Sequence, residues 1–220
     1  WSVGISDTTI VVGAHFESHD EVGLNYIYHT GSAYIFERDG AGIWSETQKI
    51  VGSDRAADIT FPDGGGPEDM SDQFGGAVDI SGNRMIIGSH HHDYNAIGAD
   101  PLSEAGAAYI FERSGGIWTE VAKLQNSDRA EIDRFGYDVG IDGNYAIVSA
   151  YSEDENEFGG VTLANAGSAY VFERDIDGNW SQTQKIVAND RSPNDRYGWS
   201  VAIDSNTILI GSIECSLDEL

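Results

Sequence analysis

The residues best suited to metal chemistry are three consecutive histidines followed by an aspartate, His90 to Asp93. Imidazole and carboxylate groups are common metal ligands. Neighbouring residues of an extended segment point to opposite sides, so the three histidines cannot all reach one ion. His90, His92 and Asp93 are therefore the candidate ligands, and an exposed polar loop is the competing interpretation.

A second candidate metal site is the acidic run from Glu153 to Glu157. Calcium takes about six to eight oxygen ligands, largely from carboxylates and carbonyls. The candidate ligands in this run are Glu153, Asp154, Glu155 and Glu157. We expect no certain cofactor; Ca²⁺ is the one candidate, and a solvated acidic loop is the alternative.

Adjacent Asp and Arg residues could form a charged active site, but they recur along the chain. The pairs are Asp54-Arg55, Asp128-Arg129, Asp133-Arg134, Asp190-Arg191 and Asp195-Arg196. A residue that recurs in this way is expected to hold a structural unit together, so we expect these pairs to brace connections. The sequence also contains no Gly-x-Ser-x-Gly elbow, phosphate-binding loop or Cys-His pair. We therefore predict no catalytic residues and no enzyme activity.

The elements that position these residues are repeated. Phe74-Gly75, Phe135-Gly136 and Tyr197-Gly198 open matching stretches that lie 61 and then 62 residues apart. An Ala-Tyr-Ile/Val-Phe-Glu-Arg run recurs three times, at 33–38, 108–113 and 169–174. A fixed period of this length indicates stacked copies of one supersecondary unit.

Each copy is predicted to form four β-strands. In the second copy, Val78 and Ile80 alternate with polar residues, whereas Met85 to Ile87 is apolar throughout and fits a strand covered on both faces. Such a small sheet must pack against a neighbour on each side, which favours a β-propeller over the alternative, a sandwich. All three lysines fall in the fourth segment, where we expect them to protect an outer sheet edge: Lys49, Lys123 and Lys185.

The expected fold is thus all-β, a β-propeller of four-stranded antiparallel blades in a partial ring of about three and a half blades. We expect one propeller domain, truncated at both ends. Blade 1 spans 1–73, lacks its first residues and carries an inserted loop at 55–71; blade 2 spans 74–134, blade 3 spans 135–196, and 197–220 is the first half of blade 4.

Charge narrows the range of partners. The chain has 12 basic and 37 acidic residues and a net charge of −25. This balance argues against nucleic acid, because nucleic-acid affinity comes mainly from Lys and Arg on phosphate. It also argues against anionic membrane surfaces, and no apolar run approaches the roughly 20 residues needed to span a bilayer.

The loops between the second and third strands are the expected binding face. They have the same length in the three copies but different contents, and they should lie on the same face as the connections between blades. Loops on a rigid scaffold commonly carry binding residues. The candidate binding residues on this face are Phe16, His19, Asp20, Asp63, Glu68, Asp69, Tyr94 and Tyr151.

The repeats resemble FG-GAP repeats, the blades of integrin-α-type propellers, and are more closely similar to the FG-GAP-like repeats of large secreted bacterial surface proteins. The resemblance rests on 135–139, 147–150, 167–174 and 180–186, and it covers nearly the whole chain. It implies an extracellular propeller used for adhesion or recognition. In integrin-type blades calcium lies between the first two strands, but here that loop, such as Ser81-Gly82-Asn83, has too few carboxylates.

We therefore expect a non-catalytic segment of a larger secreted or cell-surface protein, used for adhesion, protein–protein interaction or extracellular assembly. The alternative is a carbohydrate-binding or carbohydrate-active propeller with a pocket at the channel mouth, where aromatic residues such as Trp199 would matter. A third interpretation is a structural spacer. The expected partners are further propeller blades, from the same polypeptide or a neighbouring chain, and an extracellular protein or glycan.

Overall fold

The computed structural model describes residues 2–27, 29–55, 72–95, 98, 101–156, 158–160 and 162–214. Within these ranges the chain forms fourteen strands, β1 to β14, and no helix. It follows that no helix there is long and apolar enough to cross a membrane. The inserted loop, with Asp63, Glu68 and Asp69, and also Glu157 lie outside the described residues.

Three sheets have four strands each, and a fourth sheet has two. The first contains β1 (Val3–Ser6), β2 (Thr9–Ala14), β3 (Ser32–Arg38) and β4 (Trp44–Ile50). The second contains β5 (Val78–Ser81), β6 (Arg84–Ser89), β7 (Ala107–Ser114) and β8 (Ile117–Leu124). The third contains β9 (Val139–Asp142), β10 (Tyr145–Ala150), β11 (Ser168–Arg174) and β12 (Trp180–Ile186). The last contains β13 (Ser200–Asp204) and β14 (Thr207–Gly211).

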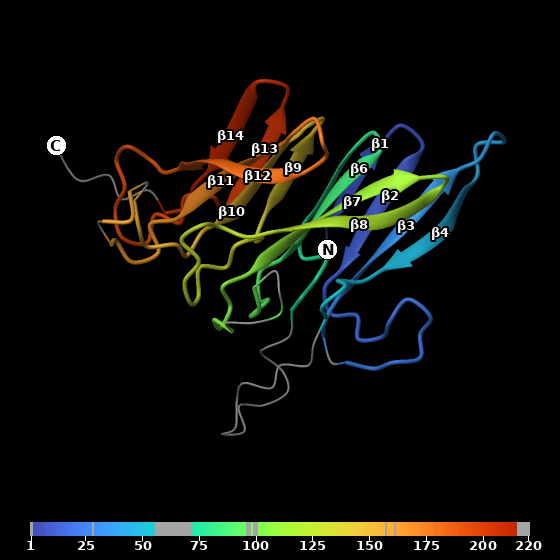
Figure 1. Cartoon of the computed structure of the whole chain (residues 1–220), viewed down its shortest axis with the longest axis horizontal. Coiled ribbons are helices and arrows are strands. Elements are labelled where there is room, and N and C mark those ends of the chain that lie inside the picture. The colour runs from blue at the N-terminus through green and yellow to red at the C-terminus, as the bar shows by residue number, and fades with distance from the viewer. Residues whose placement is uncertain are drawn as a thin grey trace.

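Each sheet is an antiparallel meander in which consecutive strands pair. The first strands of neighbouring sheets, β1, β5, β9 and β13, contact one another in that order. The sheets therefore pack face to face as successive blades (Figure 1), with the first strand of each sheet nearest the common axis. This arrangement confirms the predicted all-β partial propeller.

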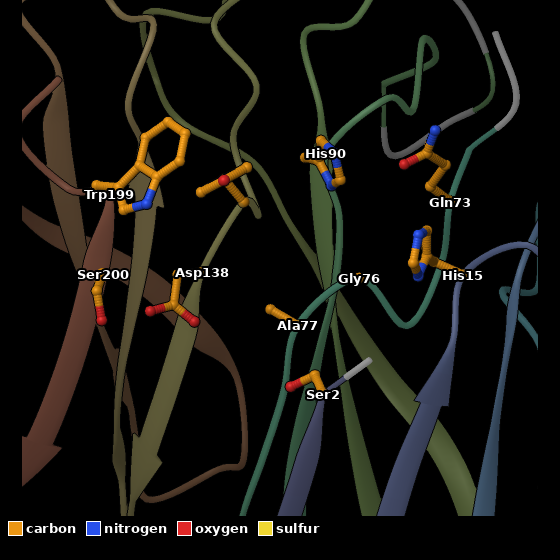
Figure 2. Close-up of a pocket in the computed structure, with 10 residues that line it drawn as sticks. Ser2, His15, Gln73, Gly76, Ala77, His90, Asp138, Trp199 and Ser200 are labelled. Carbon is orange, nitrogen blue, oxygen red and sulfur yellow. The ribbon is translucent and has the colours of Figure 1, made fainter. Parts of the chain in front are cut away.

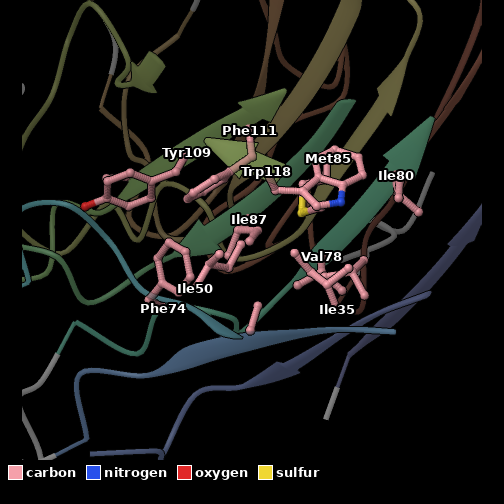
Figure 3. Close-up of a cluster of buried hydrophobic side chains, with 13 residues drawn as sticks. Ile35, Ile50, Phe74, Val78, Ile80, Met85, Ile87, Tyr109, Phe111 and Trp118 are labelled. Atoms are coloured by element: carbon pink, nitrogen blue, oxygen red, sulfur yellow. The ribbon is translucent and has the colours of Figure 1, made fainter. Parts of the chain in front are cut away.

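The apolar core lies between the sheets. One cluster joins Val11 and Ile35 of the first sheet to Met85, Ile87 and Tyr109 of the second (Figure 3). A second cluster joins the second and third sheets, and a smaller one joins the third to the half sheet. The inner sheets are thus apolar on both faces, whereas each sheet of a two-sheet sandwich would expose one face to solvent.

The two outermost sheets expose positions that the inner sheets bury. Val3 and Ile5 are 67% and 64% exposed, whereas the equivalent Val78 and Ile80 are each 6% exposed. Leu209, on the half sheet at the other end, is also exposed. Because exposed apolar surface at these positions is costly, the fold supports further blades of the same propeller as neighbours.

Glycines allow one blade to lock into the next. The connection into the second blade passes so close to β2 and β3 that a Cβ atom on Gly13 or Gly31 would collide with the backbone of Gly75 or Phe74. Gly31 also has φ +81°, which side-chain-bearing residues rarely adopt. Phe74 forms a parallel bridge with Gly31, and the same bridge recurs in the next two copies.

The prediction that the lysines protect an outer sheet edge is wrong. The side chains of Lys49, Lys123 and Lys185 are only 11%, 7% and 6% exposed. Each lies over the ring of a tyrosine on the third strand of its sheet. These lysines are therefore buried near the seam between blades, and their partners form part of the site described next.

Candidate functional site

The loops after β2, β6 and β10 lie at one end of the sheets, together with the connections between sheets (Figure 1). The short hairpins lie at the opposite end. We call the first the loop end and the second the hairpin end. This placement follows from an antiparallel meander, because alternate connections must lie at opposite ends of the strands.

The connection that follows each of the first two blades begins with an Asp-Arg pair, and the Asp of this pair bonds to the next blade. Oδ1 of Asp54 accepts a hydrogen bond from the Tyr109 hydroxyl at 2.7 Å, and Oδ2 accepts one from Lys123 Nζ at 2.5 Å. Asp128 repeats both contacts, with Tyr170 at 3.0 Å and Lys185 at 2.6 Å. The recurring aspartate thus joins two blades.

The arginine beside each aspartate reaches back to the loop of its own blade. Arg55 donates to the Ser18 carbonyl oxygen at 2.9 Å, and Arg191 donates to that of Asp154 at 3.1 Å. Arg129 makes the equivalent contact with the Asp93 carbonyl. The predicted bracing role is therefore observed, although each Asp and its neighbouring Arg use different partners. Together they hold the loop end to the seams.

A third group at each seam comes from the loop itself. Glu17, His92 and Glu153 are equivalent, since each carbonyl accepts the amide of the glycine that precedes the third strand. Glu17 accepts the Tyr34 hydroxyl at 3.1 Å, and Glu153 accepts that of Tyr170 at 2.6 Å. In the second blade a basic residue, His92, replaces the acid.

His92 is fully buried between two aspartates. Its Nδ1 lies 2.8 Å from Oδ1 of Asp72, and its Nε2 lies 3.3 Å from Oδ2 of Asp54 and 2.7 Å from Lys123 Nζ. Burial disfavours the imidazolium, but the hydrogen bonds to Asp54 and Asp72 outweigh it and raise the pKa of His92 to about 9. Burial lowers the pKa of Lys123. Because Nζ of Lys123 lies so close to Nε2 of His92, only one of these two nitrogens can direct a proton toward the other.

The third blade balances its charge differently. Asp133 is equivalent to Asp72 but faces Glu153 rather than a histidine. Burial, with the nearby Glu153 charge, raises the pKa of Asp133 to about 7. Exchange of Glu for His at one position thus decides whether the neighbouring aspartate has a cationic or an anionic neighbour.

The predicted histidine metal site is not assembled among the described residues. Both ring nitrogens of His92 face protein partners in the seam. Oδ1 of Asp93 accepts the Glu104 amide at 2.8 Å. His90 lies against Tyr137, with ring centroids 5.3 Å apart, and faces the cavity described below. The three candidate ligands therefore point to different surroundings.

The acidic run contributes two of the three members of a close carboxylate group. Oxygens of Asp128, Glu153 and Glu155 lie within 4.8 Å of one another. Lys185 pairs with both Asp128 and Glu153, so its ammonium already offsets part of the negative charge of this group. Oδ1 of Asp154 accepts the Asn165 amide. Calcium binding on this face stays a prediction.

The loops are held by internal hydrogen bonds. In the first blade, Oδ1 of Asp20 accepts the amides of Val22 and Leu24, so this predicted binding residue supports its loop from inside. In the third blade, Asn156 accepts the amides of Phe158 and Gly160 in the same way. Fixed loops of this kind can present their other side chains in defined positions.

Other predicted binding residues differ in role. Phe16 is exposed and lies between the rings of His15 and His29, and His19 is exposed beside Tyr26. The carbonyl of Tyr94 accepts a hydrogen bond from Lys123.

Tyr151 is buried in an aromatic cluster, with ring centroids 4.3 Å from Tyr137 and 4.9 Å from Trp199. Sequence reasoning missed Tyr137. Tyr137 directly follows a Phe-Gly pair, just as Trp199 follows a Tyr-Gly pair. This shared position in the repeat could have indicated Tyr137 from the sequence.

A family model described as FG-GAP repeat matches the chain three times, at residues 68–111, 118–172 and 180–218. The matched residues make up more than half of the chain. Each match includes the second strand of a copy, and the first two also reach the third strand. No curated protein matches the chain.

Proposed function

Because this chain belongs to the FG-GAP repeat family, we propose that it is a non-catalytic recognition segment of a larger secreted or cell-surface protein. Its role would be adhesion, protein–protein interaction or extracellular assembly. The loop end supplies the contact surface. The blades behind it supply a rigid support, since each seam ties a loop to the next sheet.

The observation that carries this proposal is the set of apolar side chains exposed on fixed loops. Leu24 is 80% exposed and Phe158 is 86% exposed. Phe16, Val22 and Tyr26 are also exposed on the first loop. Phe16, Val22, Leu24 and Tyr26 share the first loop, and several exposed apolar side chains on one loop are typical of protein interaction sites. The acidic excess of the chain would favour a partner with a basic rim around its apolar contact.

A non-catalytic role is supported by what the recurring polar residues do. Asp54, Lys123 and His92 are engaged with one another at a seam. Asp128, Lys185 and their neighbours are engaged in the same way in the next blade. The strongest clusters of ionisable groups thus hold blades together.

The test is capture from the extracellular and cell-surface fractions of the source organism. The bait is the intact protein, either wild type or carrying Leu24→Asp with Phe158→Asp. Ile176→Asp is the matched control, because Ile176 is 98% exposed but lies at the hairpin end. We expect one partner to be retained by wild type and by the control but lost from the loop variant. Retention by the loop variant would contradict the proposal.

A further inference from the structure

A cavity of about 370 Å³ opens at the loop end of the inner strands. It is lined by residues of all four sheets, because residues just before or at the start of β5, β9 and β13 line it, together with Ser2 beside β1. Its lining residues are Ser2, His15, Gln73, Gly76, Ala77, His90, Tyr137, Asp138, Trp199 and Ser200. The volume is within the range of small-molecule sites, about 300 to 1,000 Å³.

The cavity arises from one difference between the copies. Gly76 stands at the position that Tyr137 and Trp199 occupy in the next two copies. A glycine here leaves space where an aromatic ring would lie, and Ala77 adds a second small residue. In Figure 2, Gly76 and Ala77 lie between Trp199 and Asp138 on one side and His15 and Gln73 on the other.

One wall of the cavity is aromatic. The rings of Tyr137 and Trp199 have centroids 4.9 Å apart, and His90 packs edge-on against Tyr137. Tyr151 lies behind them and contacts both. This packing fixes the orientation of the rings before any ligand enters, which lowers the entropic cost of binding.

The polar groups of the cavity suit hydroxyl groups. His90 lines the cavity, and its Nδ1, which is buried beside Gly76, has no hydrogen-bond partner among the described protein atoms; a small movement of the ring would offer it to a ligand. The carboxylate of Asp138 accepts the amides of Val139 and Val201, one on each oxygen, and it also bonds to the side chain of Ser200, which leaves acceptor capacity for one further donor. Gln73 and Ser200 add an amide and a hydroxyl group.

The charge of the cavity disfavours an anion. Burial lowers the pKa of both His15 and His90, so both imidazoles are neutral at pH 7. The lining contains no Lys or Arg. Arg134 and Arg196 stack on the aromatic cluster, but each is paired with a glutamate.

We propose that this cavity binds a neutral saccharide, with one sugar face on Trp199 and Tyr137 and its hydroxyl groups bonded to His90, Asp138 and Gln73. A sugar ring offers both an apolar C–H face for the rings and hydroxyl groups that donate and accept. Leu24 and Phe158, the loop residues changed in the capture test, do not line this cavity, so the two sites can be tested independently.

The test begins with a panel of neutral, sialylated and sulfated glycans on the intact protein. A neutral glycan that binds is then titrated calorimetrically, and saturation-transfer NMR identifies the sugar protons near the aromatic rings. We expect binding to neutral glycans only, with the strongest transfer to one face of one sugar.

Two variants and one control make the result specific. Trp199→Ala removes the platform and should weaken binding about tenfold or more. Gly76→Tyr fills the cavity without deleting a lining group; its backbone φ suits any residue, and its Cβ would lie 3.1 Å from Nδ1 of His90, a contact that a small ring shift relieves. It should abolish binding while the melting temperature stays within a few degrees of wild type. Trp44→Phe, at the outer strand of the first sheet, should bind like wild type.

Three outcomes would overturn the proposal. The first is that no neutral glycan binds to wild type. The second is that binding survives Gly76→Tyr, which would place the sugar elsewhere. The third is that tetramethylammonium, an aromatic-cage ligand, binds in the cavity in place of every sugar.

Discussion

Asp54 and Lys123 belong to neighbouring blades, and Oδ2 of Asp54 lies 2.5 Å from Nζ of Lys123. The same relationship joins Asp128 to Lys185 one blade further on. Each aspartate stands beside an arginine that holds the loop of its own blade. A single dipeptide therefore couples the packing of two blades to the position of a loop.

The first prediction concerns the lysine at this seam. Lys185→Met leaves Asp128 and Glu153 without their cation, and breaking a buried pair in this way costs about 3 to 5 kcal/mol. Lys49→Met is the matched control, because Lys49 lies 3.7 Å from Glu17 and has no aspartate from a preceding blade among the described residues. Urea unfolding of the chain should show the larger loss for Lys185→Met, and equal losses would contradict the seam role.

The second prediction concerns the pH dependence of His92. Its folded-state pKa of about 9 lies above the ordinary value of 6.5, so its stabilisation is complete below about pH 6.5 and is lost as the pH rises through 9. Melting curves from pH 6 to 10 should show this loss in wild type and in His19→Gln, an exposed loop control. His92→Gln should lack it, and an unchanged alkaline loss in that variant would refute the assignment.

The third prediction concerns the glycine that admits the next blade. Gly31→Ala combines a φ of +81° with a collision against the Phe74 backbone, so it should cost about 3 kcal/mol or more. Gly40→Ala is the control, since no atom lies within 4 Å of the added methyl group. Gly40→Ala should change the unfolding free energy by less than about 0.5 kcal/mol. A tolerated Gly31→Ala would mean that the blades do not interlock there.

The fourth prediction concerns further blades. In the isolated chain, Ile80→Ala should cost about 2 to 5 kcal/mol, whereas Ile5→Ala should cost less than about 0.5 kcal/mol. In the intact protein a preceding blade would cover Ile5, and the two substitutions should then cost similar amounts. If Ile5→Ala stays neutral there, the first sheet has no such neighbour.

The strands were predictable from the sequence because their apolar pattern repeats. Val78 with Ile80 and the run from Met85 to Ile87 point to one sheet with two buried faces, and the structure has that sheet. The role of the lysines was not predictable in this way. A lysine on an outer strand is usually interpreted as protection of the sheet edge, and only the three-dimensional structure shows that an aspartate of the preceding blade pairs with it.

The candidate site was only partly predictable. The loop end follows from topology, and Phe16 is exposed there as expected. The roles within the loops depend on long-range contacts: Asp20 faces inward, Tyr151 is buried in the aromatic cluster, and His92 replaces a glutamate. Only the alignment of Gly76 with Tyr137 and Trp199 could have indicated the cavity.

The most direct test of the recognition face is hydrogen–deuterium exchange of the intact protein with and without its captured partner. We predict slower exchange at the loop end, in residues 15–27, 89–95 and 150–156, and unchanged exchange in the hairpins at 39–43, 114–117 and 175–179. Protection confined to the hairpins, with the loops unchanged, would contradict the account.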